Sequence, residues 1–270
     1  MFTNAFMAND ISEFLSVWLD NEMLSSENST VFNRYYRSYK RCFGKYIRYY
    51  YRRQTKEIMD IIDKFKNPSI LDVGCGCGTE TLWFAYKLKD LGGSSVTAID
   101  IDEKMLDTAR ERQQIIESEI KQDLPVVFSK KSILDLSCDV KYDVIWMEQA
   151  FHHLEPRDDV LRKLSDLTKP GGYLVFSESN AWSPINQLFL LWHRGFSTVY
   201  WKNGVMIGNE RILTPKALKN NLQKNGFDNV DYQYFRMLPN EKWADYFLYP
   251  NAKLPLAFLY THYSLIAKKV

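Results

Sequence analysis

Residues 70–81 read ILDVGCGCGTET, and this stretch decides the fold. Glycines stand at positions 74, 76 and 78, although the 270-residue chain contains only twelve glycines. An apolar run precedes them and a helical pattern follows. Alternating glycines between a first strand and its helix let a ligand approach the backbone, and free N–H groups at the helix start favour negative charge. The stretch therefore predicts a site for a nucleotide-like ligand.

From Asn67-Pro68 onward, short apolar runs alternate with helical patterns. The runs that read as strands are Ser69–Val73, Val96–Ile99, Val126–Phe128, Tyr142–Met147, Tyr173–Phe176, Phe227–Phe235 and Tyr260–Lys268. Strands that alternate with helices imply βαβ units and a parallel sheet covered on both faces. We expect a turn at Lys169–Gly172, and a short helix that begins after Thr214 and stops at Gly226.

Charge and hydrophobic periodicity divide the chain into an N-terminal helical extension, 1–66, and a main domain, 67–270. Residues 1–33 carry five acids and no base, whereas residues 34–57 carry nine Lys or Arg and one acid. A tyrosine stripe and a basic face share one expected helix over residues 34–65. The basic face reads as a solvated surface, or as a contact to an anionic substrate, to lipid headgroups or to the acidic arm.

Composition narrows the class of protein. Four cysteines form no disulfide framework in a chain of this size, so we expect a reducing cytoplasm. The apolar runs are too short to span a bilayer, although peripheral membrane contact stays open. Cys75 and Cys77 lack a second pair or a nearby His, which argues against a metal. The sequence contains no recognisable nucleic-acid-binding module, which makes nucleic acid an unlikely partner. No feature of the sequence indicates the oligomeric state.

Asp72 and the glycine spacing separate this stretch from the dinucleotide type, whereas an acid at the place of Asp100 is common to both types. Asp72 ends the first strand, where it is a poor neighbour for a pyrophosphate but a good anchor for an ammonium group. Asp100 ends the next strand, where an acid can hold ribose hydroxyls. The spacing G-x-G-x-G also differs from G-x-G-x-x-G. These features argue against a nicotinamide oxidoreductase.

Further motifs follow in order, and together they resemble class I S-adenosylmethionine-dependent methyltransferases. The motifs are Asp72–Gly78, the IDIDEKML run at 99–106, Tyr142–Leu154, Leu167–Gly172 and the YLVFSES run at 173–179. The resemblance covers about residues 67–180 and resumes over the last two strands. It implies an α/β fold with a doubly wound, mostly parallel sheet of seven strands whose last strand is antiparallel. It also implies a helical lid inserted after the fifth strand, at 181–213.

The resemblance also implies cofactor-binding residues. The methionine part of S-adenosylmethionine would lie against Asp72, Gly74, Cys75, Gly76 and Gly78, the ribose against Asp100, and the adenine against Ile101 and Met105. Ser132 and Ile133 fall where many relatives carry an Asp that accepts from the adenine amino group. Glu148, after the fourth strand, is expected to contact cofactor or substrate.

His152 and His153 are the candidate catalytic residues, because histidine takes a proton near neutral pH. We prefer His152, and a helix-capping role is the alternative. In the insertion, Trp182, Trp192, Tyr200, Trp201 and Arg211 are candidate substrate-binding residues, unless this segment is a packed helical cap.

The expected reaction is in-line methyl transfer to an oxygen, nitrogen or carbon of a small molecule. The expected lid and the lack of an RNA-binding appendage favour a small acceptor. Two alternatives remain: a methyltransferase that acts on protein or nucleic acid, and a non-catalytic subunit that binds the cofactor.

Overall fold

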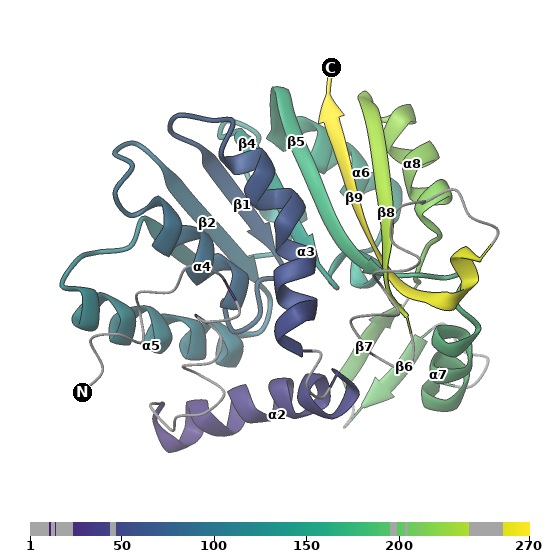
Figure 1. Cartoon of the computed structure of the whole chain (residues 1–270), viewed down its shortest axis with the longest axis horizontal. Helices are drawn as coiled ribbons and strands as arrows, with labels where there is room; N and C mark the ends of the chain where they lie inside the picture. Colours follow the sequence, from purple (N-terminus) through teal and green to yellow (C-terminus); the bar gives the residue numbers. More distant parts are fainter. Residues whose placement is uncertain are drawn as a thin grey trace. The chain divides into compact units, whose positions relative to one another are not determined.

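Figure 1 shows the computed structural model of the chain. It describes residues 24–43, 47–194, 199–202, 205–209, 211–237 and 256–270, together with Ile11 and Phe14. The chain forms two compact units, Met1–Leu136 with Tyr142–Val144, and Ser137–Lys141 with Ile145–Val270. The division into an extension at 1–66 and a domain at 67–270 stays a prediction.

Seven strands form one sheet in the order β3-β2-β1-β4-β5-β9-β8. They are β1 (Ser69–Val73), β2 (Ser95–Asp100), β3 (Val126–Lys130), β4 (Tyr142–Glu148), β5 (Thr168–Ser179), β8 (Phe227–Met237) and β9 (Tyr260–Lys269). Strands β1, β2 and β3 pair in parallel, and β9 pairs antiparallel with both β5 and β8. This order confirms the expected doubly wound sheet with an antiparallel last strand.

The described α-helices are α2 (Ser26–Phe43), α3 (Ile47–Ile62), α4 (Thr79–Leu88), α5 (Glu103–Ile120), α6 (Arg157–Leu167), α7 (Pro184–Arg194) and α8 (Pro215–Lys224). The described residues also form three short 3-10 turns: η2 (Ile133–Asp135), η3 (Phe151–His153) and η4 (Ala257–Leu259). No described helix is both long and apolar enough to cross a bilayer.

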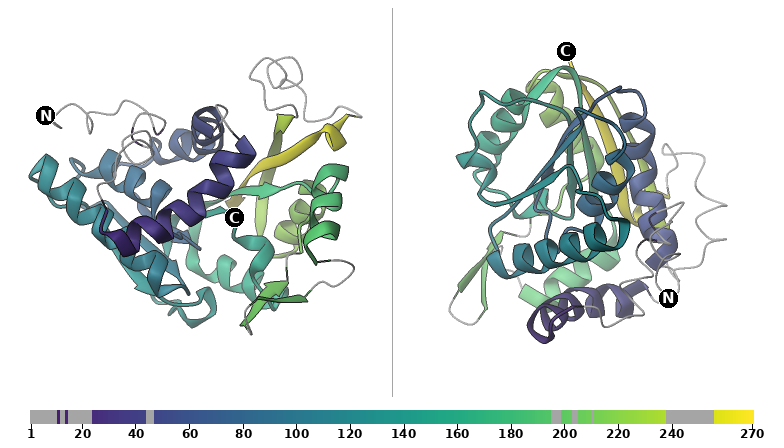
Figure 2. Two further views of the ribbon diagram at one scale, coloured as in Figure 1. Left: turned by 90° about the horizontal axis from the view of Figure 1, so that it is seen from below. Right: turned by 90° about the vertical axis from the view of Figure 1, so that its left-hand side faces the viewer.

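In the first unit, the N-terminal part forms two helices where the sequence predicted one over 34–65. Helix α2 lies beside α5, which Figure 1 and, in purple and teal, Figure 2 show. Polar contacts join them, because Ser25 and Asn28 donate hydrogen bonds to the Glu111 carboxylate. Helix α3 carries the buried Tyr50 of the expected tyrosine stripe, and the adjacent Tyr51, which the stripe did not include, is buried as well.

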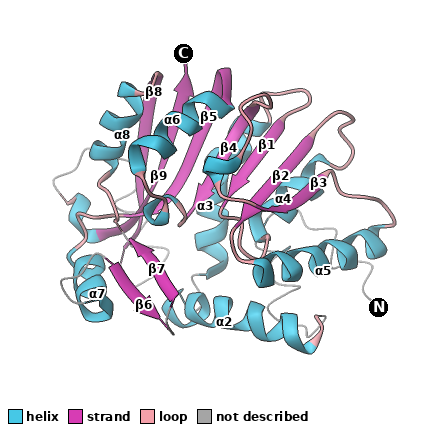
Figure 3. Ribbon diagram, turned by 180° about the vertical axis from the view of Figure 1, so that it is seen from behind, coloured by secondary structure: helices cyan, strands magenta, loops and turns pink. Residues whose placement is uncertain are grey.

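In the second unit, α6 and α8 cover the same face of β5, β9 and β8 (Figure 3). Helix α8 begins and ends as predicted. The Thr214 hydroxyl accepts from the Ala217 N–H at 3.1 Å, and Gly226 follows the helix with φ 81°.

Two features of this unit differ from the sequence prediction. Strand β5 begins at Thr168, so the segment Lys169–Gly172 is the start of the strand rather than a turn before it. Within this first part of the strand, Gly171 has a left-handed backbone with φ 76°. The insertion contains the helix α7, as expected, and also an unforeseen two-stranded sheet of β6 (Val199–Lys202) and β7 (Val205–Asn209).

Candidate functional site

All three glycines of the loop after β1 have a left-handed backbone. Their φ angles are 75° at Gly74, 52° at Gly76 and 72° at Gly78. Side chains with a Cβ rarely adopt this conformation, so each position favours glycine. The N–H groups of Gly74 and Cys75 both donate to the Ile99 carbonyl, at 2.8 and 3.1 Å. The loop is therefore held at the carboxyl end of β2.

Asp100 joins this loop to the next one. Its Oδ2 accepts from the Gly76 N–H at 2.9 Å, and its Oδ1 accepts from the Asp102 N–H at 2.9 Å. The neighbouring Ile101 is 73% exposed, and Met105 is half-buried in the first turns of α5. An acid beside open apolar surface is the arrangement that a ribose and its adenine require.

Two further carboxyl groups are buried beside the glycine loop. Asp72 is 3% exposed and accepts from the Thr81 hydroxyl. The pKa of Asp72 is raised to about 7, mainly by burial; the Thr81 hydrogen bond opposes this shift, and the nearby Asp100 charge adds to it. Burial, with the Asp72 charge next, raises the pKa of Glu80 to about 8. Any cation that entered here would favour both carboxylates.

Sequence reasoning missed Glu80 and its partner on α3. Gln54 is fully buried, and its Nε2 donates to Glu80 Oε1 at 2.6 Å. The only sequence signal was the acid two positions after the last glycine, in the run GTET. Gln54 carried no signal, because its contact joins residues 26 positions apart.

Arg112 on α5 supports the far end of the loop, and sequence reasoning missed it as well. The side chain is fully buried, and Nη1 donates to the Cys77 carbonyl at 2.6 Å and to the Thr79 hydroxyl at 3.0 Å. Its guanidinium also lies 4.8 Å from the centre of the Phe32 ring on α2. Charged donors make strong hydrogen bonds, so Arg112 holds the loop where α4 begins.

The remaining predicted cofactor residues of this unit make hydrogen bonds within their own loop or are buried. The Ser132 hydroxyl caps η2 by accepting from the Leu134 N–H at 3.3 Å, and Asp135 accepts from the Ser132 N–H at 3.3 Å. Ile133 is buried. Cys75 and Cys77 are buried too, and burial raises the pKa of both thiols. Among the residues described, no group of three or more His, Cys, Asp or Glu could hold a metal ion.

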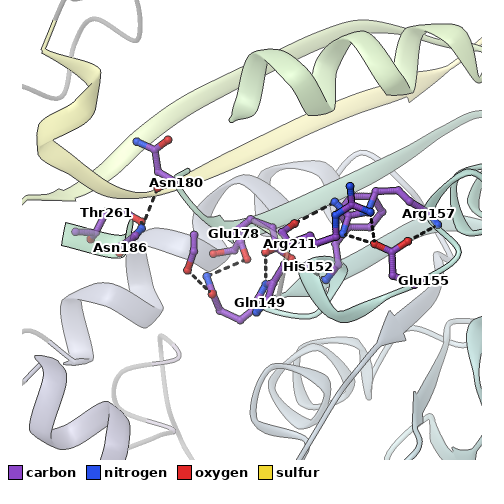
Figure 4. Close-up of polar contacts among 12 residues, drawn as sticks. Gln149, His152, Glu155, Arg157, Glu178, Asn180, Asn186, Arg211 and Thr261 are labelled. Atoms are coloured by element: carbon purple, nitrogen blue, oxygen red, sulfur yellow. Dashed lines mark hydrogen bonds and ion pairs between the residues drawn. The ribbon is translucent and has the colours of Figure 1, made fainter. Parts of the chain in front are cut away.

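The second unit brings His152 together with Glu178, as Figure 4 shows. The distance from His152 Nδ1 to Glu178 Oε2 is 2.7 Å, and the other oxygen, Oε1, accepts from the Phe151 N–H at 2.8 Å. Glu178 is 2% exposed at the end of β5. A carboxylate on Nδ1 fixes the tautomer with the proton there, which leaves the lone pair of Nε2 to accept a proton.

The structure distinguishes the two histidines. The His153 ring lies 4.0 Å from the His152 ring, centre to centre, but its side chain is exposed. Glu178 was missed in the sequence, although it lies in the SES run that ends the fifth strand. Because that end of the strand lies at the ligand-binding edge of such sheets, its acid was the available signal.

The turn that carries His152 is tied to its surroundings through the backbone. The Gln149 N–H donates to the Ser177 carbonyl at 2.8 Å, and the Ser179 hydroxyl donates to Gln149 Oε1 at 2.7 Å. Gln149 has the left-handed φ of 47°, which only a well-supported non-glycine residue keeps. Glu148, just before it, is buried at the end of β4.

Of the predicted substrate residues, the structure brings Arg211 to this turn. The Arg211 N–H donates to the His152 carbonyl at 3.0 Å, and its guanidinium lies 3.4 Å from Glu155. Trp182 and Trp192 are instead 61% and 88% exposed. The backbones of Tyr200 and Trp201 belong to β6, but their side chains lie outside the described part of the structure.

Comparison with known proteins identifies the family. The methyltransferase domain family matches residues 43–232, which is most of the chain. The chain belongs to this family. Its fold is that of solved S-adenosylmethionine-dependent methyltransferases, as its motifs predicted. S-adenosylmethionine is the cofactor of this family.

Individual relatives share part of the chain. Methyltransferase GfsG of Streptomyces halstedii is 28% identical over 61% of this chain and 57% of that protein. Malonyl-[acyl-carrier protein] O-methyltransferase of Buchnera aphidicola is 32% identical over 44% of this chain and 43% of that protein. The chain spans about half the length of the curated relatives it matches.

Solved structures show the same fold at low identity. Magnesium protoporphyrin IX methyltransferase from Synechocystis PCC 6803 has a TM-score of 0.56 with this chain at 18% identity. The match covers 90% of this chain and 96% of that chain.

Proposed function

We propose that this methyltransferase transfers a methyl group to a small-molecule acceptor, and that His152 acts as the general base. The observation that carries the proposal is the His152–Glu178 pair, whose Nδ1 to Oε2 distance is 2.7 Å. A methyl transfer needs a base only where the acceptor must lose a proton. The pair therefore favours an acceptor that carries a hydroxyl, a protonated amine or an acidic C–H group.

The first unit carries the residues that we expect to contact the cofactor. S-adenosylmethionine carries an electrophilic methyl on a positively charged sulfur, together with an ammonium group. Asp72 and Glu80 are buried acids that a bound ammonium would stabilise as carboxylates. Asp100 would accept from the ribose hydroxyls, with Ile101 and Met105 beside the adenine. The glycines leave the backbone open to the ligand.

Glu178 would position the base rather than react. Its carboxylate accepts the Nδ1 proton of His152 and would stabilise the imidazolium that forms when Nε2 takes a proton from the acceptor. The acceptor's nucleophilic atom then forms its bond to the methyl carbon as the carbon–sulfur bond breaks. Most of the rate would come from holding these atoms in line.

The relatives support a small acceptor by the names they carry. They include malonyl-[acyl-carrier protein] and ubiquinone biosynthesis O-methyltransferases and a sarcosine/dimethylglycine N-methyltransferase. These acceptors differ in their reacting atom, so they support the class and no single substrate. The alternatives are methylation of protein or nucleic acid, and cofactor binding without transfer.

A labelling experiment distinguishes the three cases. Cell extract is separated into molecules below and above about 3 kDa, and each fraction is incubated with the protein and S-adenosylmethionine labelled in the methyl group. The proposal expects label in the small-molecule fraction. Label in the large fraction would assign the protein to the first alternative if it stays on the macromolecule after neutral hydroxylamine has cleaved thioesters; label that this treatment releases marks a small acceptor carried on a protein. Cofactor binding with no transfer to either fraction would assign it to the second.

His152→Asn tests the base once a labelled acceptor is known. Loss of a general base lowers turnover about 10²–10⁴-fold, with the binding of S-adenosylhomocysteine unchanged. Glu178→Gln should lower kcat more than it changes KM, because a glutamine can place its NH₂ against Nδ1 and reverse the tautomer. His153→Asn is the matched control, because this exposed neighbour lacks the contact to Glu178. Equal losses in the two histidine variants would contradict the role of His152.

A further inference from the structure

Helix α7 exposes most of its large apolar side chains, whereas Asn186 and Leu190 lie on its inner side. Ile185, Leu188, Phe189 and Trp192 follow the spacing i, i+3, i+4, i+7 of one helical face, and they are 42–88% exposed. Leu191 adjoins this face and is 42% exposed.

Hydrogen bonds hold the helix in this orientation. The amide of Asn186 donates to the Asn180 carbonyl at 3.0 Å and to the Thr261 carbonyl at 2.6 Å, and Figure 4 shows it turned toward them. Asn180 itself is fully buried and donates to the Tyr260 carbonyl at 2.8 Å. Leu190, one turn after Asn186, is buried on the same side. The outward apolar face is therefore a built feature of the second unit.

The exposed face carries enough apolar surface to bind a partner. Trp182, just before the helix, adds a ring that is 61% exposed. Together with the side chains of α7 this surface is on the order of several hundred Å², the size at which a patch on a monomer marks an interaction site. Its two tryptophans belong to the residue type that concentrates at membrane–water interfaces.

The charge of the segment indicates which partner fits. Residues 181–209 contain no Asp or Glu, whereas Arg194 and Lys202 follow the apolar face along the chain. A segment with apolar and aromatic residues, positive charge and no acid complements an anionic lipid surface. Packing against the protein's own core does not require so long a stretch without Asp or Glu.

We propose that α7 and Trp182 form a docking surface for an anionic lipid bilayer. The helix lies in the membrane interface with Leu188, Phe189 and Trp192 among the acyl chains. On the opposite side of the helix, the hydrogen bonds of Asn186 hold it to the rest of the second unit. Eleven residues are too few to cross the bilayer, so the contact is peripheral. Burial of large apolar side chains drives such binding, so the loss of two should weaken it at least about 10-fold.

Sedimentation with vesicles tests the proposal on the full chain. The probes are vesicles of phosphatidylcholine alone and of phosphatidylcholine with about one third phosphatidylglycerol. We expect the protein to sediment with the mixed vesicles and several-fold less with the neutral ones. The double variant Leu188→Gln with Leu191→Gln should lose binding at least about 10-fold. Val127→Gln is the control, because Val127 is 63% exposed on β3, outside this surface.

Tryptophan fluorescence provides a second measurement. Trp192 should shift its emission to the blue on the mixed vesicles, and Trp192→Phe should remove most of that shift. Both altered leucines are surface residues, so the double variant should keep its far-UV circular dichroism. Failure to sediment with either vesicle, or equal binding by the double variant, would overturn the proposal. So would a concentration-dependent dimer that the double variant abolishes, because the surface would then belong to a second copy of the chain.

Discussion

Asp72 is the residue at which the requirements of folding and of ligand binding conflict most. Its carboxyl group is 3% exposed, and burial raises its pKa from 3.8 to about 7. Above that pH the protein must hold a buried negative charge with one hydroxyl donor, Thr81. A ligand that carries an ammonium group would compensate the charge. The site is therefore less stable empty than filled.

Asp72→Asn should stabilise the ligand-free protein at alkaline pH. The folded state binds this proton more tightly than the unfolded chain, so its contribution falls as pH rises from 3.8 to about 7 and then stays low. A shift of this size corresponds to about 4 kcal/mol. Urea unfolding should show the variant nearly equal to wild type at pH 4 and more stable by up to that amount at pH 8. The same variant should bind S-adenosylhomocysteine more weakly.

Parallel pH profiles for the two proteins would show that the buried carboxyl group has an ordinary pKa. Glu80→Gln offers an independent check, because burial raises the pKa of Glu80 to about 8. The stabilisation by Glu80→Gln should keep growing up to about pH 8, beyond the pH at which that of Asp72→Asn levels off. The asparagine and the glutamine both keep an oxygen that can accept from the present donors.

At the scale of elements, the glycine loop joins β1, β2, β3, α4 and α5 into one packed unit. Gly78 shows this most directly, because a Cβ at this position would lie 3.0 Å from the Ala109 Cβ and 3.0 Å from two atoms of the Phe128 ring. The loop therefore needs glycine here for its conformation and also for the approach of α5 and β3. Arg112 then holds the adjoining Cys77 and Thr79 from the α5 side.

Gly78→Ala and Gly171→Ala distinguish the need for a left-handed backbone from the need for space beside α5 and β3. Both glycines have a similar left-handed backbone, with φ 72° and 76°, but a Cβ at Gly171 would meet nothing within 4 Å. Gly171→Ala should cost about 1–2 kcal/mol for the backbone alone. Gly78→Ala should cost a further 1–3 kcal/mol or so for the contact with Ala109 and Phe128. Urea unfolding of the two variants measures the difference, and equal losses would exclude the packing role.

At the scale of the whole molecule, the sequence predicted the sheet because its signals are local. Each buried strand is a short apolar run, and the glycine and acid motifs mark the strand ends. The contacts that it could not predict join distant segments: Gln54 with Glu80, Arg112 with Cys77, and His152 with Glu178. No periodicity records such pairs. The β6–β7 hairpin was missed for another reason, because its aromatic residues read as part of a helical cap.

Ligand specificity can be tested on the whole chain by its thermal unfolding. A ligand that binds only the folded state stabilises it by RT ln(1 + [L]/Kd), which is about 2.7 kcal/mol at 100 times Kd. For a chain of this size, that stabilisation raises the melting temperature by about 5–10 °C. S-adenosylhomocysteine should produce this rise, because its ammonium and ribose groups suit the Asp72 and Asp100 carboxyl groups. NAD should produce none, since its pyrophosphate would lie against Asp72.

Asp100→Ala should remove most of the rise by taking away the acceptor for two hydroxyls, whereas the exposed Asp228→Ala should leave it intact. A rise with NAD and none with S-adenosylhomocysteine would mean that the glycine loop holds a different ligand from the one its acids predict.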